Sequence, residues 1–169
     1  MSEARQQAYI EAPVAAVWDL LADVDRHPEW WPRVVAVECE GLEAGCTYRQ
    51  VTQTPLGKDN MHLRVDSMED CRNLLIRCVN TGTFVHWTLT EAQDGTFVDA
   101  TFGMEPVKLK YRAFDLALGH RFFRSWLQES LDAMMDLNER YGIEMRPETV
   151  PEICAEHGLW HPMLEMVNG

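Results

Sequence analysis

The side chains best suited to move a proton or hold a ligand oxygen are a tyrosine and a histidine far apart in the sequence. Tyr48 lies in a segment of alternating residues, and His120 lies one helical turn before Phe123. An imidazole exchanges protons near neutral pH, and either group can hydrogen-bond an oxygen. Tyr48 and His120 are therefore the candidate catalytic residues. For His120 the alternative is a core histidine bonded to a backbone carbonyl or to water.

The sequence gives little evidence of motifs for metal binding, cofactor binding or nucleophilic catalysis. Cys154, His157 and His161 have the spacing of metal ligands on one helical face, but no fourth ligand is evident and Pro162 follows directly. We therefore expect no metal. The sequence contains no G-x-S-x-G, P-loop or G-x-G-x-x-G motif, so we expect no cofactor. Five cysteines cannot all pair and none form C-x-x-C, which favours reduced thiols.

Length and composition predict one folded domain. The chain has 169 residues, 46% hydrophobic and 25% charged, and a formal net charge of −12. Such a charge opposes binding to nucleic-acid phosphates and to anionic membrane surfaces. No apolar run approaches the roughly 20 residues of a membrane helix, and the charged start does not suit a signal peptide. We expect a cytoplasmic protein with no nucleic-acid partner and no membrane insertion.

Hydrophobic periodicity predicts an α+β chain. Residues 6–10 suit an edge strand, and a helix is expected from residue 13 because apolar residues recur there at helical spacing. Residues 27–32 hold at most one short turn of helix between prolines. Residues 34–105 read as about six antiparallel strands, and the period becomes helical over about 113–141. We therefore expect a long C-terminal helix to cover one face of a curved antiparallel sheet.

Two predicted hairpins determine which side chains face that helix. One has a two-residue turn at Asp94-Gly95, and the other has a tight turn at Cys71-Arg72. In both, one face is apolar and the other polar, so each register is self-consistent. The side chains expected on the inner face are Met61, Leu63, Val65, Leu74, Ile76, Cys78, Val85, Trp87, Leu89, Val98, Ala100, Phe102 and Met104. Four side chains that resemble catalytic candidates are expected in solvent: His62, Arg64, Arg77 and His86.

The strand before these hairpins carries polar side chains toward the core. If Cys39 opposes Cys46, then Tyr48, Gln50 and Thr52 all point inward. An unsatisfied buried polar group costs about 1–3 kcal/mol, so a packed core would rarely accept three of them. A cavity that holds water or a ligand removes the difficulty. The alternative is a one-residue error in the register, because the connecting loop defines it poorly.

A single stripe of the long helix is expected to face the sheet. The residues at helical spacing on this stripe are Leu116, His120, Phe123, Leu127, Leu131 and Met134.

Several short segments, in this order, carry a resemblance to a known family. They are Ala-Pro-Val-Ala-Ala-Val-Trp at 12–18, Trp-Trp-Pro-x-Val at 30–34 and Asp-Gly-Thr-x-Val at 94–98, followed by the long amphipathic helix. The chain resembles the START-like, Bet v 1-like (SRPBCC) superfamily over about residues 6–141. Its bacterial members are often called polyketide cyclase/dehydrase or lipid-transport proteins. The resemblance implies the helix-grip fold, a seven-stranded antiparallel curved sheet wrapped around a long C-terminal helix with an internal cavity.

Within that superfamily, residues 81–87 and 102–106 are similar to aromatase/cyclases of aromatic polyketide synthesis. We therefore expect residues 1–142 to bind a small hydrophobic or aromatic molecule, either polyketide-like or lipid-like, in the cavity. The first alternative is a polyketide cyclase or dehydratase, and a weaker one is a protein–protein adaptor with a solid core. Residues 143–169 are expected to form an acidic extension that packs on the domain or on a partner subunit, which leaves a homodimer open.

The expected ligand-binding residues combine the inward side chains of the sheet with those of the helix. They are Tyr48, Gln50, Thr52, Met61, Leu63, Ile76, Trp87, Leu89, Ala100, Phe102, Met104, His120, Phe123 and Leu127.

Overall fold

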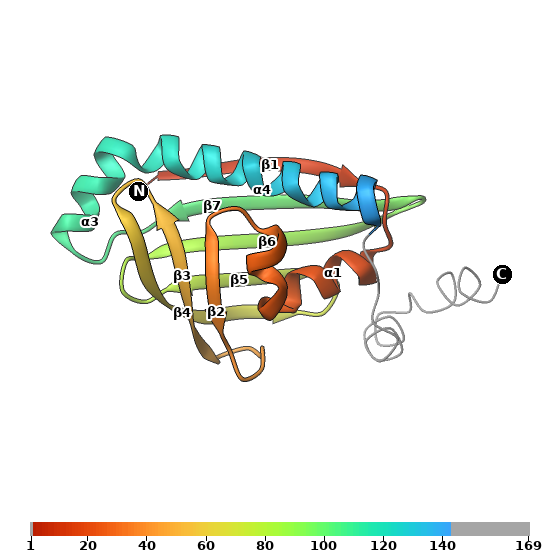
Figure 1. Ribbon diagram of the computed structural model, residues 1–169, viewed down its shortest axis with the longest axis horizontal. Helices are drawn as coiled ribbons and strands as arrows, with labels where there is room; N and C mark the ends of the chain where they lie inside the picture. Colours follow the sequence, from red (N-terminus) through yellow and green to blue (C-terminus); the bar gives the residue numbers. More distant parts are fainter. Residues whose placement is uncertain (1, 143–169) are drawn as a thin grey trace.

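The computed structural model describes residues 2–142, which form a curved antiparallel sheet and a long helix (Figure 1). The seven strands lie in the order β1-β7-β6-β5-β4-β3-β2. The elements are β1 (Ser2–Ile10), α1 (Val14–Ala22), η1 (Val24–Arg26), α2 (His27–Trp30), β2 (Val34–Glu38), β3 (Thr47–Thr54), β4 (Gly57–Glu69), β5 (Asn73–Cys78), β6 (Thr83–Ala92), β7 (Gly95–Met104), α3 (Leu109–Phe114), η2 (Asp115–Gly119) and α4 (His120–Tyr141). The predicted helix-grip fold is confirmed. The expected extension of residues 143–169 lies outside the described residues.

Two elements are longer than their sequence patterns predicted. Strand β1 begins at Ser2 because it pairs with β7 along its whole length, from the Ser2–Met104 pair to the Ile10–Thr96 pair. The C-terminal helical segment begins at Leu109, and η2 is a π-helical turn that separates α3 from α4. Helix α4 then runs along β1 and β7 (Figure 1).

The registers of two hairpins differ from prediction, yet the same faces are buried. In the β6–β7 hairpin Ala92 pairs with Gly95, which shifts the expected register by two residues. A two-residue shift leaves every side chain on its original face, because the side-chain period of a strand is two. In the β4–β5 hairpin a longer turn offsets the register by one residue, and a bulge between Val65 and Ser67 increases the shift to two residues, which returns the side chains to the expected face.

The polar side chains of β3 point inward, as the predicted pairing of this strand required. Val37 pairs with Gln50 and Glu38 with Arg49, again two residues from the expected register. Tyr48, Gln50 and Thr52 are consequently all buried. The one-residue slip is therefore excluded, and the polar row needs a physical explanation.

Four aromatic rings fill the middle of the space between the sheet and α4, and we call them the aromatic centre: Trp31, Trp87, Phe102 and Trp126. The Trp31 and Trp126 rings stack with their centroids 5.5 Å apart. Trp31 Nε1 donates to Ser130 Oγ and Trp126 Nε1 donates to the Pro32 carbonyl, each at 2.8 Å. These bonds join the α2–β2 connection to α4, so the centre of the fold is solid.

The outer face of the sheet carries the polar side chains that the hairpins directed there. His62 and Arg64 are exposed, and Arg77 and His86 are half-buried. Among the described residues, Cys39, Cys46 and Cys78 are free thiols. Among the described helices, none combines the length and apolar character needed to cross a membrane.

Candidate functional site

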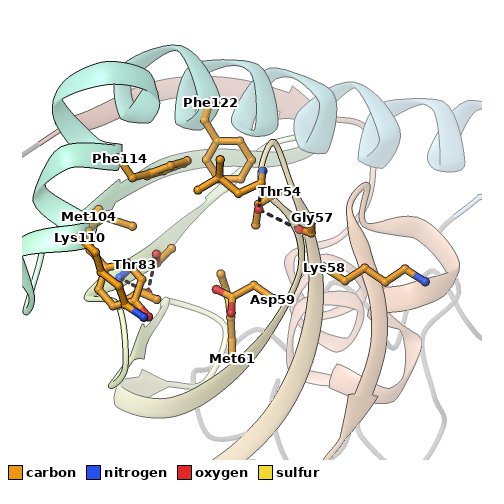
Figure 2. A pocket seen from close by; sticks show the side chains of 13 residues that line it. Thr54, Gly57, Lys58, Asp59, Met61, Thr83, Met104, Lys110, Phe114 and Phe122 are labelled. Carbon is orange, nitrogen blue, oxygen red and sulfur yellow. Dashed lines mark hydrogen bonds between the residues drawn. The ribbon is translucent and has the colours of Figure 1, made fainter.

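A hollow with an apolar wall lies at one end of the sheet, between the β3–β4 turn and α3 (Figure 2). Its volume is about 300 Å³. We call it the entrance pocket, and it is lined by Thr54, Leu56, Gly57, Lys58, Asp59, Met61, Thr81, Thr83, Met104, Lys110, Tyr111, Phe114 and Phe122. A pocket of this size can enclose a small organic molecule.

The two walls of the entrance pocket differ in chemistry. Phe114 and Phe122 from the helical segment form an apolar wall (Figure 2). The other side comes from the sheet and carries Asp59, Thr83 and Met104. Asp59 points into the pocket, because it lies two residues before the inward Met61 on β4 and therefore on the same face.

A second, much smaller space continues inward from the entrance pocket. We call it the inner pocket, and it is lined by Trp31, Tyr48, Gln50, Met61, Leu63, Ile76, Thr83, Phe84, Val85 and Trp126. Its volume of about 10 Å³ is close to that needed for one water molecule. Met61 and Thr83 belong to both pockets, so these two side chains stand between them.

Two buried polar atoms beside the inner pocket have no hydrogen-bond partner within residues 2–142. They are the hydroxyl oxygen of Tyr48 and Oε1 of Gln50. The Gln50 amide is oriented because its Nε2 donates to Thr52 Oγ1 at 3.0 Å, and Thr52 Oγ1 donates to Met61 Sδ at 3.4 Å. Burial raises the pKa of the Tyr48 phenol, so the hydroxyl stays protonated and serves as a donor. The site thus presents one donor and one acceptor.

The structure divides the predicted ligand-binding residues into four groups, and their role in binding stays a prediction. Five line the inner pocket: Tyr48, Gln50, Met61, Leu63 and Ile76. Met61 and Met104 line the entrance pocket. Seven are buried in the core without lining either space: Thr52, Trp87, Leu89, Ala100, Phe102, Phe123 and Leu127. His120 is exposed.

The prediction that His120 faces inward is wrong, and so is its core-histidine alternative. At this turn Gly119 is the buried residue, and a Cβ there would lie 2.5 Å from Asp115 Oδ1. The π-helical turn η2 also changes the helical phase, since its wider turn inserts a residue relative to an α-helix. Leu116, predicted on the same stripe, is consequently 86% exposed. Tyr48 and His120 do not meet in one site.

Sequence reasoning missed several side chains of the two pockets. Asp59 and Thr83 were detectable, because each extends by two residues the inward alternation already assigned to Met61 and Val85. Tyr111 gave no such signal, since the predicted helix began only at residue 113. Trp31 lies just after the four-residue helix α2, which is too short to show a period.

The segments that resemble aromatase/cyclases lie side by side at the entrance pocket. Thr83 pairs with Met104, and the Glu105 amide donates to the Gly82 carbonyl at 2.9 Å. Gly82 has a φ of +83°, and a Cβ there would lie 1.8 Å from the Glu105 carbonyl oxygen. Glycine is therefore required for this close approach. The shared segments shape one wall of the pocket.

A metal centre is not apparent in the described part of the chain. Within residues 2–142 no three histidine, cysteine, aspartate or glutamate side chains lie together as metal ligands would. The weak motif of Cys154, His157 and His161 lies outside that range, so the expectation of no metal there stays a prediction.

Comparison with solved structures gives relatives of the same fold at low identity. XoxI from Bacillus cereus is 17% identical with a TM-score of 0.61, and the match covers 83% of this chain and 97% of that one. A START superfamily protein from Mycobacterium smegmatis is 10% identical with a TM-score of 0.61, over 80% of this chain and 98% of that one. DynU16, a protein in the dynemicin biosynthetic locus, is 20% identical with a TM-score of 0.59, over 86% of this chain and 50% of that one.

Sequence comparison gives the family. The curated proteins provide no significant match. The family model described as polyketide cyclase/dehydrase and lipid transport matches residues 1–139, which is most of the chain. This match shows that the chain belongs to the polyketide cyclase/dehydrase and lipid transport family.

Proposed function

We propose that the chain binds a small, largely apolar or aromatic molecule whose body occupies the entrance pocket and whose polar end reaches Tyr48 and Gln50. The observation that carries the proposal is the pair of polar atoms, one on each residue, that have no partner within residues 2–142. Small-molecule sites combine apolar walls with a few placed polar groups. A ligand oxygen that accepts from Tyr48, or a ligand hydroxyl that donates to Gln50, would satisfy them.

Met61 supplies a route between the two pockets. Its side chain borders both of them, and methionine is flexible about three bonds. Rotation of Met61 would join the entrance pocket to the inner pocket and let a ligand reach both polar atoms. The adaptor alternative expected a solid core throughout, whereas the pocket of about 300 Å³ favours ligand binding.

Native mass spectrometry of the freshly purified full chain tests the proposal, followed by organic extraction and identification of what is released. Binding of the fluorescent dye 8-anilinonaphthalene-1-sulfonate gives a second readout. Asp59→Trp should abolish both signals, because the indole would occupy the entrance pocket. The proposal fails if this variant binds the dye and the extracted compound as the unchanged chain does.

Asn60→Trp is the matched control. It places the same side chain on the other face of β4, at the residue after Asp59, which is exposed and lines neither pocket. We expect this variant to retain dye and ligand. If the unchanged chain carries no ligand and binds neither the dye nor a polyketide-like or lipid-like compound, the pocket is not a binding site.

A cyclase or dehydratase acting on a polyketide-like chain is the second candidate. The observation that favours it is Asp59, a carboxylate that points into the entrance pocket and could accept a proton there (Figure 2). The protonated Tyr48 would supply a donor to a substrate carbonyl. Asp59→Asn should then lower turnover at least about 100-fold while the substrate still binds. A carrier would keep its affinity in this variant and show no turnover to lose.

A further inference from the structure

The helical segment that borders the entrance pocket has a second face, which no part of residues 2–142 covers. On one side Tyr111 and Phe114 line the pocket. On the other, Leu109 and Leu116 are 81% and 86% exposed, and Arg112 between them is exposed as well. Positions 109, 112 and 116 follow helical spacing, so these side chains share one face. Isolated exposed leucines are common, but here two highly exposed leucines lie near each other on one helical segment and form a small apolar surface.

Basic side chains are concentrated around this face. Residues 106–124 carry Lys108, Lys110, Arg112, Arg121 and Arg124, all exposed, and a single acidic residue, the buried Asp115. The whole chain has a net charge of −12, so this segment differs in sign from the rest of the molecule. In Figure 1, α3 lies at one end of the molecule, where it can meet a flat surface.

We propose that this face, formed by the outward side of α3 and η2, docks on an anionic lipid surface. An amphipathic helical segment with exposed leucines and flanking lysines and arginines lies in the plane of such a surface. Leu56, 76% exposed at the β3–β4 turn across the pocket from α3, extends the contact to the other side of the opening. The entrance pocket would then open beside the lipid. A protein partner would instead need complementary pockets for leucines that project from separate segments.

Net charge alone led to the opposite expectation, repulsion from anionic membranes. That expectation treats the charges as evenly spread. Screening by salt limits the distance over which each charge acts to about 10 Å at moderate ionic strength. Along residues 106–124, every exposed charged side chain is a lysine or an arginine. The proposal concerns docking on the surface and involves no spanning helix.

Flotation of the full chain with lipid vesicles tests the proposal. We expect binding to vesicles of phosphatidylcholine mixed with phosphatidylglycerol, and at least roughly tenfold weaker binding to phosphatidylcholine alone or at high salt. Leu109→Glu combined with Leu116→Glu should reduce binding to the mixed vesicles at least about tenfold. Lys108→Ser combined with Arg112→Ser should remove most of the preference for the anionic lipid.

Val35→Glu combined with Phe97→Glu is the matched control. These residues are 43% and 51% exposed and lie on β2 and β7, so the double variant adds the same charges away from α3. We expect it to float like the unchanged chain. All substituted positions are exposed, and circular dichroism should show each variant folded. Because Leu109 and Leu116 do not line the entrance pocket, dye binding should be unaffected, which separates this test from that of the proposed function.

Three outcomes would overturn the proposal. The first is equal flotation of the unchanged chain and the Leu109→Glu/Leu116→Glu variant. The second is binding to soluble polyglutamate with no binding to either vesicle, which would assign the face to an acidic protein. The third is a dimer that only this double variant dissociates, which would assign the face to a second copy of the chain.

Discussion

The aromatic centre and the entrance pocket occupy the same side of one sheet, yet one is solid and the other hollow. In the centre, Trp87 and Phe102 from the sheet meet Trp126 from α4, and Trp31 fills the remaining space. At the entrance the sheet contributes shorter polar side chains, among them Thr83. The strands alternate in the same way in both places. The side chains that they carry, and the helix above them, make the difference.

The helical segment changes character between the two regions. Over the aromatic centre α4 is a regular helix whose inward side chains are fully buried. Over the entrance the π-helical turn η2 interrupts it, and Phe114 before the turn is only half-buried. A wider turn changes which residues face the sheet, so the packing cannot continue unchanged. Four predictions test how far the solid and hollow regions depend on each other.

Removing a ring from the aromatic centre should have the largest effect. Trp126→Ala leaves a cavity and removes the donor to the Pro32 carbonyl, so we expect the free energy of unfolding to fall by about 3–5 kcal/mol. Urea denaturation measures the change. Leu116→Ala, on the exposed face of the same helical segment, should change stability by less than about 0.5 kcal/mol. Equal losses of stability in the two variants would contradict the difference between the packed centre and the exposed helical face.

The acid sensitivity of the solid region should come in part from His27. Burial lowers its pKa to about 4, although Nε2 donates to the Leu21 carbonyl at 2.8 Å and its ring packs against Trp31. Below pH 6.5 the unfolded chain binds the proton and the folded chain does not, so stability falls until about pH 4. The expected loss over this window is about 3 kcal/mol.

His27→Gln isolates that contribution, because its amide can still donate to the Leu21 carbonyl but does not titrate. Unfolding measured by urea from pH 7 to pH 4 should show a flatter dependence in this variant. The same slope in both chains would show that other groups cause the acid sensitivity.

Tyr48→Phe, between the aromatic centre and the entrance pocket, should change stability and ligand binding in opposite directions. Because the hydroxyl is buried without a partner within residues 2–142, its removal should raise the free energy of unfolding by about 1 kcal/mol. The same variant should bind the extracted ligand roughly fivefold more weakly, since a hydrogen bond contributes about 1 kcal/mol. Thermal unfolding and dye displacement measure the two effects. A loss of stability would mean that the hydroxyl has a partner in the folded chain.

The smallest effect is expected at His120. The side chain is exposed at the start of α4 and lines neither pocket. His120→Ala should change stability by less than about 0.5 kcal/mol and leave dye binding unchanged. A large loss of binding would place this histidine in the site after all.

The sequence predicted the inner face of the sheet better than that of the helix, because an error in register or phase has different consequences in the two kinds of element. All three hairpin registers were misplaced, yet Gln50, Met61 and Trp87 still lie on the inner face. Shifts of two residues preserve the face of a strand, and the bulge after Val65 changed the one-residue shift of the β4–β5 hairpin into a shift of two. In the helical segment the π-helical turn changed the phase at Leu116, and both Leu116 and His120, predicted on the inner stripe, are exposed.

Several strand residues of the candidate site were predicted and the helical ones were not, again because strand alternation is a local pattern. Tyr48 and Gln50 were identified because polar residues alternated into an expected core, which is a local pattern. The apolar wall formed by Phe114 and Phe122 depends on where α3 ends and α4 begins, and periodicity alone did not reveal that boundary.

The sequence by itself determined the order of the elements, the inner face of each strand and the family resemblance, because these follow from local alternation and short segments. Only the tertiary structure decided where the space beside those faces is filled and where it stays open. Trp31 and Trp126 come from segments far apart in the sequence, and their stacking closes the centre. Whether two such rings meet depends on packing between elements, which no local pattern records.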